Sequence, residues 1–285
     1  TKTLIINNLF NVLQFVVLTP LCSVVKASPI QDEHNRLRTG KTTGGKSPFA
    51  RAYPMYEGWT HLQQASLQDA FDHALFMAAN VLAYPHRDEI YPIYFRGDED
   101  YEKVMDVFRE IVGREPGDIH GAAIFKNILI DGFDRKKSCQ NDPNNVLVAA
   151  LLPGRVDRTI ANIVCCEKCW NYPHMEDGID CDDLGTTVSV KMSSLGGVIL
   201  HELVHFDPMC VPSIGQQTED IAWGPLSVRK LRQNEPEKAC LNADNYKWYA
   251  QHLWWTVNCD RKFSGPRGSI DTYEPWCGIQ GCQIQ

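Results

Sequence analysis

Two histidines four residues apart, with a glutamate directly after the first, are the residues of this chain best suited to chemistry. They form the run His201-Glu202-Leu203-Val204-His205. On a helix, side chains four positions apart lie on one face, so both imidazoles can bind one metal ion. Zinc suits two neutral imidazole nitrogens and an oxygen ligand, and it leaves a fourth position for a water molecule whose pKa falls toward about 7. Glu202 then stands where it can take a proton from that water.

A catalytic zinc site of this type needs a third protein ligand, and the residues that follow limit the choice. The metzincin continuation requires Gly three residues and His six residues after the second histidine, where this chain has Pro208 and Val211. That class is therefore excluded. The downstream acids that remain as candidates are Glu219, Asp220, Glu235 and Glu237.

The run Thr218-Glu219-Asp220-Ile221-Ala222-Trp223-Gly224 resembles the aspzincin metalloendopeptidases, the deuterolysin and peptidyl-Lys metalloendopeptidase group found largely in fungi. The family pattern is Gly-Thr-x-Asp-x-x-Tyr-Gly, in which the Asp is the third zinc ligand. The resemblance continues through Asn242-Ala243-Asp244-Asn245-Tyr246, where the family reads Asn-Ala-Asp-Ser-Tyr. It implies a secreted endopeptidase of zincin-like α+β fold, with one zinc ion on His201, His205 and Asp220 and with Glu202 as general base.

The resemblance has departures that bear on activity. Gln217 stands where the family has Gly, and Trp223 stands where it has a Tyr whose hydroxyl is thought to stabilise the developing oxyanion. An indole N–H donates a hydrogen bond from a different position, and the loss of an oxyanion donor costs about 10²–10³ in rate. Trp223 or Tyr246 is the residue expected to assist catalysis. The loop after His205 is longer than in the Lys-specific members, and its Cys210 is expected to form a disulfide.

Another departure concerns the substrate. In the Lys-specific members, two acids on the Asn-Ala-Asp helix receive the substrate ammonium group. Asp244 keeps the first acid, but Lys247 stands at the second position. Residues three apart on a helix are neighbours, so Lys247 can pair with Asp244 and neutralise this substrate-binding pocket. We therefore expect the preference for lysine to be lost, in favour of acidic or apolar residues.

Apolar periodicity indicates the elements that position these residues. Apolar stripes predict helices over residues 62–83, 101–112 and 239–257, and Ser193-Ser194 supply caps for a helix that carries the two histidines. An aromatic segment, residues 90–95, reads as strand-like. Short β-branched runs predict strands at residues 122–130, 146–152, 159–164 and 186–192. The expected fold is α+β, helix-rich with a small mixed sheet and stapled by disulfides.

The N-terminal segment and the cysteines indicate export. Residues 1–27 combine Lys2, an apolar stretch and the small-residue pattern ending at Ala27, which is typical of a signal peptide; a membrane anchor is the alternative. We expect a flexible lead-in over residues 28–53, a metallopeptidase domain over residues 54–257 and a Cys-rich extension over residues 258–285. Removal of the signal leaves ten of the eleven cysteines, an even number that suits disulfides. Cys166 and Cys169 fit a redox motif, but the adjacent Cys165 favours a disulfide knot.

Charge and composition limit the partners. The net charge is −7, and it becomes −9 once Lys2 and Lys26 are removed, which disfavours nucleic acid as a partner. We expect a monomer that acts on proteins or peptides and has no membrane contact after signal cleavage. Two other functions remain open: a secreted zinc-binding protein of the same fold without useful turnover, and a disulfide-framed structural protein in which the histidine motif is a coincidence. Glu202 favours the enzyme, because a binding site needs no general base, and Trp223 favours the zinc-binding protein.

Overall fold

The computed structural model describes residues 52–114, 120–135, 137–141, 147–151, 161–173 and 179–268, and of residues 147–151 it describes the backbone alone. All of these residues belong to one compact unit, Thr42–Gln285. The predicted signal peptide lies outside the described residues, as do nearly all of the lead-in and the end of the C-terminal extension. The domain boundaries therefore stay predictions.

Two of the predicted helices form where their apolar stripes place them. Helix α2 (His61–Ala83) begins with a capping box, in which the backbone N–H of Gln63 donates to Thr60 Oγ1 at 3.3 Å and the Gln63 side chain accepts from the Thr60 N–H at 3.1 Å. Helix α4 (Gly97–Val112) ends at Gly113, whose φ of 101° is readily adopted only by glycine. Helix α4 buries one apolar face, as expected, whereas α2 is buried on all sides from His73 to Val81.

The aromatic segment at residues 90–95 is a short helix, so the prediction of a strand-like segment is wrong. Helix α3 (Tyr91–Tyr94) has Pro92 in its first turn, where no backbone N–H is needed. The helical turn buries Tyr91 and Tyr94 together, and both rings contact Tyr249. An alternating strand would have placed Tyr91 and Tyr94 on opposite faces, so aromatic packing decided the conformation.

A small mixed sheet confirms the α+β prediction. The strand order is β1-β2-β4-β3, with parallel β1/β2 and β2/β4 pairs and an antiparallel β3/β4 pair. The strands are β1 (Met55–Glu57), β2 (Ile128–Asp131), β3 (Leu147–Leu151) and β4 (Ala161–Cys165). Strands β2 and β4 are buried along their whole length, which explains why their residues are apolar except for Asp131 and Asn162.

Two of the strand predictions need correction. Most of the predicted strand at residues 122–130 is the 3₁₀ helix η1 (Ala123–Asn127), and only its end belongs to β2. Residues 186–192 form no strand; Thr187 makes an isolated bridge to Ser264, and η4 (Val190–Met192) follows. Strand β1, at three residues, was too short to be predicted from the sequence.

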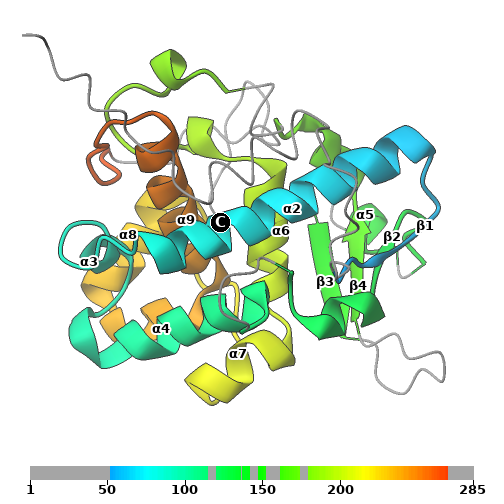
Figure 1. Cartoon of the computed structure of the whole chain (residues 1–285), viewed down its shortest axis with the longest axis horizontal. Helices are drawn as coiled ribbons and strands as arrows, with labels where there is room; N and C mark the ends of the chain where they lie inside the picture. Colours follow the sequence, from blue (N-terminus) through cyan, green and yellow to red (C-terminus); the bar gives the residue numbers. More distant parts are fainter. Residues whose placement is uncertain are drawn as a thin grey trace, which may run out of the picture. The chain divides into compact units, whose positions relative to one another are not determined.

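The other elements follow the sheet or surround the histidine helix. They are α5 (Ser138–Asn141), η2 (Glu167–Asn171), η3 (Cys181–Leu184), α6 (Leu195–Val204), α7 (Asp207–Ile214), α8 (Pro225–Asn234), η5 (Pro236–Leu241) and α9 (Ala243–Asn258). In Figure 1, α6 passes behind α2, with α9 on one side and strands β3 and β4 on the other. All ten residues of α6 are buried.

Two glycines at the start of α6 allow this packing. A Cβ at Gly196 would lie 2.7 Å from His73 Cβ and 3.0 Å from the Ala70 carbonyl oxygen, both on α2. A Cβ at Gly197 would overlap the side-chain amide of Gln251 on α9. Ser194 caps the helix through a 3.1 Å bond from the Gly197 N–H, which confirms the predicted capping region. Glycine therefore sets how closely α2 and α9 approach α6.

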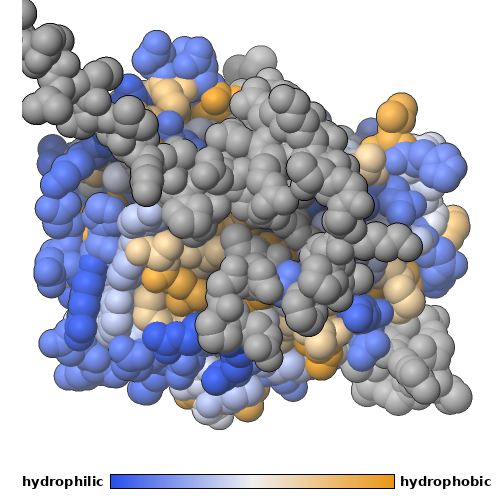
Figure 2. Space-filling view, viewed as in Figure 1, coloured by the Kyte–Doolittle hydropathy of each residue, from blue (hydrophilic) through white to orange (hydrophobic). Residues whose placement is uncertain are grey.

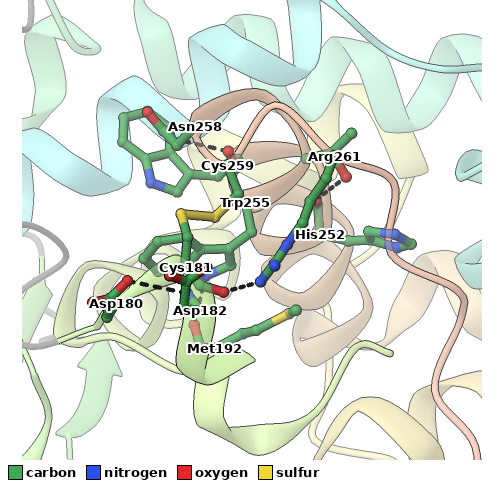
Figure 3. Close-up of a disulfide and its surroundings, with 11 residues drawn as sticks. Asp180, Cys181, Asp182, Met192, His252, Trp255, Asn258, Cys259 and Arg261 are labelled. Atoms are coloured by element: carbon green, nitrogen blue, oxygen red, sulfur yellow. Dashed lines mark hydrogen bonds between the residues drawn. A yellow bond between two sulfur atoms is a disulfide. The ribbon is translucent and has the colours of Figure 1, made fainter. Parts of the chain in front are cut away.

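Three disulfides are present among the described residues: Cys139–Cys166, Cys165–Cys169 and Cys181–Cys259. The first two interlock around the adjacent Cys165 and Cys166, so the predicted disulfide knot is confirmed. Figure 3 shows the third, which joins the start of η3 to the end of α9. Beside it, Trp255 donates its indole N–H to the Met192 carbonyl at 3.0 Å and Arg261 donates to the Cys181 carbonyl.

One edge of the molecular surface is hydrophilic. In Figure 2, hydrophilic side chains cover the edge where Figure 1 places α3 and α4, in agreement with the charged residues of α4. Within the described part of the chain, no helix has both the length and the apolar character that a membrane crossing requires.

A buried histidine predicts how stability depends on pH. His252 is fully buried, and its Nε2 donates to the Phe263 carbonyl at 3.0 Å; Nδ1 lies 3.2 Å from the Tyr94 hydroxyl, from which it accepts when the ring is neutral. Burial lowers its pKa from 6.5 to about 4. Between these values the unfolded chain binds a proton that the folded chain excludes, so the free energy of unfolding falls by up to about 3 kcal/mol as the pH drops.

Denaturant unfolding at pH 7, 6, 5 and 4 checks this prediction. The variant His252→Gln should lose this part of the pH dependence, whereas His61→Gln, a change at an exposed histidine, should keep it. An equal slope in the His252→Gln variant and the wild type would show that His252 is not the titrating group.

Candidate metal centre

Three side chains bring one potential ligand atom each to a common point. His201 Nε2 and His205 Nε2 lie 3.2 Å apart, and Asp220 Oδ1 lies 2.9 Å from the first and 3.2 Å from the second. Both histidines extend from the end of α6, and Asp220 comes from the loop between α7 and α8. Within the described ranges this is the one such cluster of His, Cys, Asp or Glu ligand atoms.

The triangle has the size that a tetrahedral zinc site requires. Zinc binds nitrogen and oxygen at about 2.0–2.1 Å, so two ligands of a tetrahedral ion lie about 3.3 Å apart. The observed edges of 2.9, 3.2 and 3.2 Å agree with that spacing. Three protein ligands leave one position of the tetrahedron for a water molecule or a substrate oxygen. The residues present therefore fit a catalytic zinc ion.

Both histidines are oriented by their second ring nitrogens. His201 Nδ1 lies 3.1 Å from Asp244 Oδ1, and His205 Nδ1 lies 3.3 Å from the Thr218 carbonyl oxygen. Because a carboxylate and a carbonyl can only accept, each Nδ1 carries the proton and each Nε2 presents its lone pair to the cluster. Two separate acceptors thus fix the tautomer that binds a metal.

The loop that carries Asp220 is attached to the start of α9. The Glu219 N–H donates to the Leu241 carbonyl at 2.7 Å, and the Ala243 N–H donates to the Glu219 carbonyl at 3.1 Å. On the other side of Asp220, the Asn242 side chain also holds the loop. Its oxygen accepts from the N–H groups of Ile221 and Ala222 at 2.8 and 3.0 Å, and its NH₂ group donates to the Ala222 carbonyl at 3.0 Å. The third ligand is therefore positioned by main-chain bonds and by one buried amide.

Asn242 and Thr218 are functional residues that the sequence analysis did not single out. Asn242 directly precedes α9, where Asn is expected to cap its own helix, yet it makes no capping bond and holds the Asp220 loop instead. Thr218 accepts from His205 through its carbonyl and donates its hydroxyl to the Val204 carbonyl at 3.0 Å. The sequence offered one indication of their roles: Thr218 and Asn242 each begin one of the two runs that resemble the family pattern.

Asp244 connects the cluster to α9. Besides His201, its carboxylate accepts from the Gly224 N–H at 2.7 Å and from the Trp248 indole at 2.9 Å. Lys247 Nζ lies 3.4 Å from Asp244 Oδ1, so the predicted ion pair forms, and both side chains are buried. A charged substrate group near Asp244 would meet a carboxylate that already has a cationic partner.

The electrostatics of the cluster favour negative carboxylates. Burial alone would raise the pKa of Asp244, but Lys247 and His201 lower it to about 2. Burial likewise opposes charge on Asp220, yet the hydrogen bonds from His201 and His205 hold its pKa well below the usual range. Burial lowers the pKa of His201, but when its Nε2 carries a proton that proton bonds to Asp220, and this bond and the one to Asp244 raise the pKa to about 10; a bound zinc ion would take the place of that Nε2 proton. The cluster therefore attracts positive charge, and it runs from the buried His201 through the half-buried His205 to the exposed Asp220.

The other predicted catalytic residues lie in different surroundings. Glu202 is buried on α6, directly after the first ligand. Trp223 is 56% exposed, three residues after Asp220. Tyr246 is fully buried among Phe95 and Phe108 and donates its hydroxyl to the Cys240 carbonyl at 2.9 Å, and burial raises its pKa well above 10. This packing and the bond to a main-chain carbonyl give Tyr246 a structural role.

The predicted disulfide at Cys210 is wrong. Cys210 is a free, buried thiol on α7 and lies 3.5 Å from the Phe206 carbonyl, and Cys240 is also free and buried. Helix packing rather than a covalent bond holds the loop, since α7 packs on α4. The histidine helix ends at Val204, and α7 begins at Asp207 with Pro208 in its first turn.

Comparison with known proteins agrees with this geometry. The aspzincin family model, described as lysine-specific metallo-endopeptidase, matches residues 126–251. That segment contains all three residues of the triangle, together with Asn242 and Asp244. The predicted resemblance to the aspzincin metalloendopeptidases is confirmed.

Individual relatives match shorter segments. A peptidyl-Lys metalloendopeptidase of Armillaria mellea and an extracellular protease of Aeromonas hydrophila are each 32% identical over 72 residues, which is 25% of this chain and 19% of each relative. The match thus spans about a fifth of the length of these curated relatives. Among solved structures, a zinc peptidase from Grifola frondosa aligns with a TM-score of 0.45 and 18% identity, over 68% of this chain and 97% of that chain.

The contact between Asp244 and His201 predicts a change in metal affinity. Replacement of such an acceptor typically weakens metal binding 10- to 100-fold, so Asp244→Asn should bind zinc about 10- to 100-fold more weakly than the wild type. Competition with a chromophoric chelator measures this, with circular dichroism as a check on folding. Asp182→Asn, at an exposed aspartate, is the matched control. Equal zinc affinity in the Asp244→Asn variant and the wild type would show that the contact does not orient the ligand.

Proposed function

Since residues 126–251 carry the aspzincin pattern, we propose that this protein is a zinc-dependent endopeptidase that hydrolyses peptide bonds in proteins or peptides. The observation that supports this most is the triangle of His201, His205 and Asp220 ligand atoms, whose edges of 2.9–3.2 Å fit one tetrahedral zinc ion. Glu202 follows the first ligand on the same buried helix. The site thus combines a position for a metal with a carboxylate suited to proton transfer.

Each residue has a definite task in the proposed reaction. When bound, zinc would lower the pKa of a water molecule and polarise the scissile carbonyl. Glu202 would take the proton of the attacking water and deliver it to the leaving amine. Its side chain is only 6% exposed, so bulk water has little access to the proton it carries. Asp244 and the Thr218 carbonyl hold the two imidazoles in the orientation that this chemistry needs.

We further propose that the protein acts outside the cell. Disulfides persist in oxidising compartments, and three of them join described residues of this chain. The signal peptide predicted over residues 1–27 supports the same location. A single zinc ion, a monomeric state and the absence of nucleic-acid or membrane partners remain predictions from the sequence.

The proposed mechanism predicts the effect of removing the general base. Glu202→Gln should lower kcat for an unfolded protein substrate by at least about 10²-fold, because proton transfer by a positioned carboxylate contributes about 10²–10⁴. The zinc content should stay equal to that of the wild type, because Glu202 is not a ligand. Glu237→Gln, at an exposed glutamate, should retain full activity.

A chelator should abolish wild-type hydrolysis, and added zinc should restore it. Activity that resists the chelator, or an active Glu202→Gln variant, contradicts the mechanism. Stoichiometric zinc in a wild-type protein that hydrolyses nothing would support the alternative function, a secreted zinc-binding protein.

The ion pair between Lys247 and Asp244 leads to a prediction about specificity. We propose that Lys247 neutralises the Asp244 carboxylate, which would otherwise bind the ammonium group of a substrate lysine. The wild type should therefore show no strong selection for lysine in a peptide library. Lys247→Gln should increase the cleavage of lysine-containing peptides relative to leucine-containing ones, because Asp244 then lacks this partner. Lys126→Gln, at an exposed lysine, should leave the profile unchanged. Strong selection for lysine by the wild type would disprove this proposal.

A further inference from the structure

Trp223 combines an exposed side chain with a fixed backbone. The side chain is 56% exposed, although the chain on both sides of it is held by buried groups. Before it, Asn242 binds both the N–H and the carbonyl of Ala222, at 3.0 Å each. After it, the Gly224 N–H donates to Asp244 Oδ2 at 2.7 Å. The indole is therefore presented to solvent from a segment whose backbone is already ordered.

The same bonds connect the backbone at Trp223 to the candidate metal centre. It follows Asp220 by three residues, and Asp244 accepts from Gly224 through Oδ2 while it accepts from His201 through Oδ1. Two hydrogen bonds to one carboxylate thus connect the peptide group after Trp223 with a ligand imidazole. A peptide whose scissile bond lies at the metal would pass close to this residue.

An exposed tryptophan on an ordered backbone suits recognition better than oxyanion stabilisation. Tryptophan is enriched among the residues that dominate binding energy, and pre-ordering lowers the entropic cost of binding. An oxyanion donor works best in a site that excludes water, and the exposure of this indole is the opposite condition. At the position of the family's tyrosine, this chain therefore presents a large and mostly exposed apolar ring.

We propose that Trp223 is a specificity-determining residue whose ring contacts an apolar side chain of the peptide substrate beside the scissile bond. This inference rests on the proposed peptidase function. A fully buried aromatic residue of this size covers about 150–250 Å². Somewhat more than half of Trp223 is still exposed, and a leucine or phenylalanine side chain can cover part of that area. The Lys247–Asp244 pair, which also lies beside the centre, removes the anionic charge that would favour a cationic residue instead.

Two substitutions at Trp223 separate its possible roles. Trp223→Phe keeps an aromatic ring and removes the N–H donor, whereas Trp223→Ala removes both. The matched control is Phe133→Ala, because Phe133 is similarly exposed at 58% but follows strand β2 and stacks with Arg135. The substrates are three peptides that differ in one residue beside the cleaved bond, which is leucine, glutamine or lysine.

The expected result is a change in KM that depends on the peptide. Trp223→Ala should raise KM for the leucine peptide about tenfold, with kcat changed less than about threefold and the glutamine peptide little affected. Trp223→Phe and Phe133→Ala should resemble the wild type. A fall in kcat of about 10²–10³ in Trp223→Phe would instead identify the N–H as an oxyanion donor. A loss confined to the lysine peptide would identify a cation–π contact, and unchanged kinetics in Trp223→Ala would also overturn the proposal.

A binding measurement separates this inference from the proposed function. In the Glu202→Gln background, the zinc-loaded protein should bind the leucine peptide about tenfold more weakly after Trp223→Ala. If the wild type hydrolyses no peptide but this difference in affinity is found, the peptidase proposal fails and the contact stands. If hydrolysis is present and no difference is found in either assay, the contact fails and the peptidase proposal stands.

Discussion

The buried carboxylate of Asp244 is the group on which the geometry of the candidate metal centre depends. It is 2% exposed, and a buried charge is tolerated only when it is paired and hydrogen-bonded. Its partners come from three elements: His201 on α6, the Gly224 N–H before α8, and Trp248 with Lys247 on its own helix. The positive end of the α9 dipole also favours a negative charge in this first turn. One charge thus fixes the imidazole, the ligand loop and the helix relative to one another.

The burial of α6 links the chemistry to the core. This helix is apolar in most of its length and is surrounded by other elements, yet it ends in two imidazoles and carries a carboxylate. Gly196 and Gly197 let α2 and α9 approach it closely, and Gln251 of α9 accepts from the Ser194 N–H at 3.2 Å where the helix begins. A change that loosens this packing would also move the ligands, because close-packed interiors transmit strain.

Sequence reasoning succeeded where the signal was local. The long stripes of α2, α4 and α9, the spacing of His201 and His205 and the pair of Asp244 with Lys247 all depend on neighbours within a few positions. It failed where distant packing decides: the helical turn of α3 and the burial of the Tyr246 ring are set by aromatic residues far away in the chain, and Cys210 remains a free thiol on a helix that packs on α4. Asn242 was missed for the same reason, since its partners lie 20 and 21 positions earlier.

The disulfide between Cys181 and Cys259 encloses the candidate metal centre in a covalent ring. It closes a ring of chain that contains α6 to α9, and with them His201, His205 and Asp220. The exposed residues Gly215, Gln216 and Gln217 lie inside that ring, between the second histidine and the aspartate. A single cut there would open the ring without separating the ligands into two molecules. A nick at this loop by any peptidase, including a second copy of this protein with the activity proposed above, would thus leave the three residues on one covalent framework.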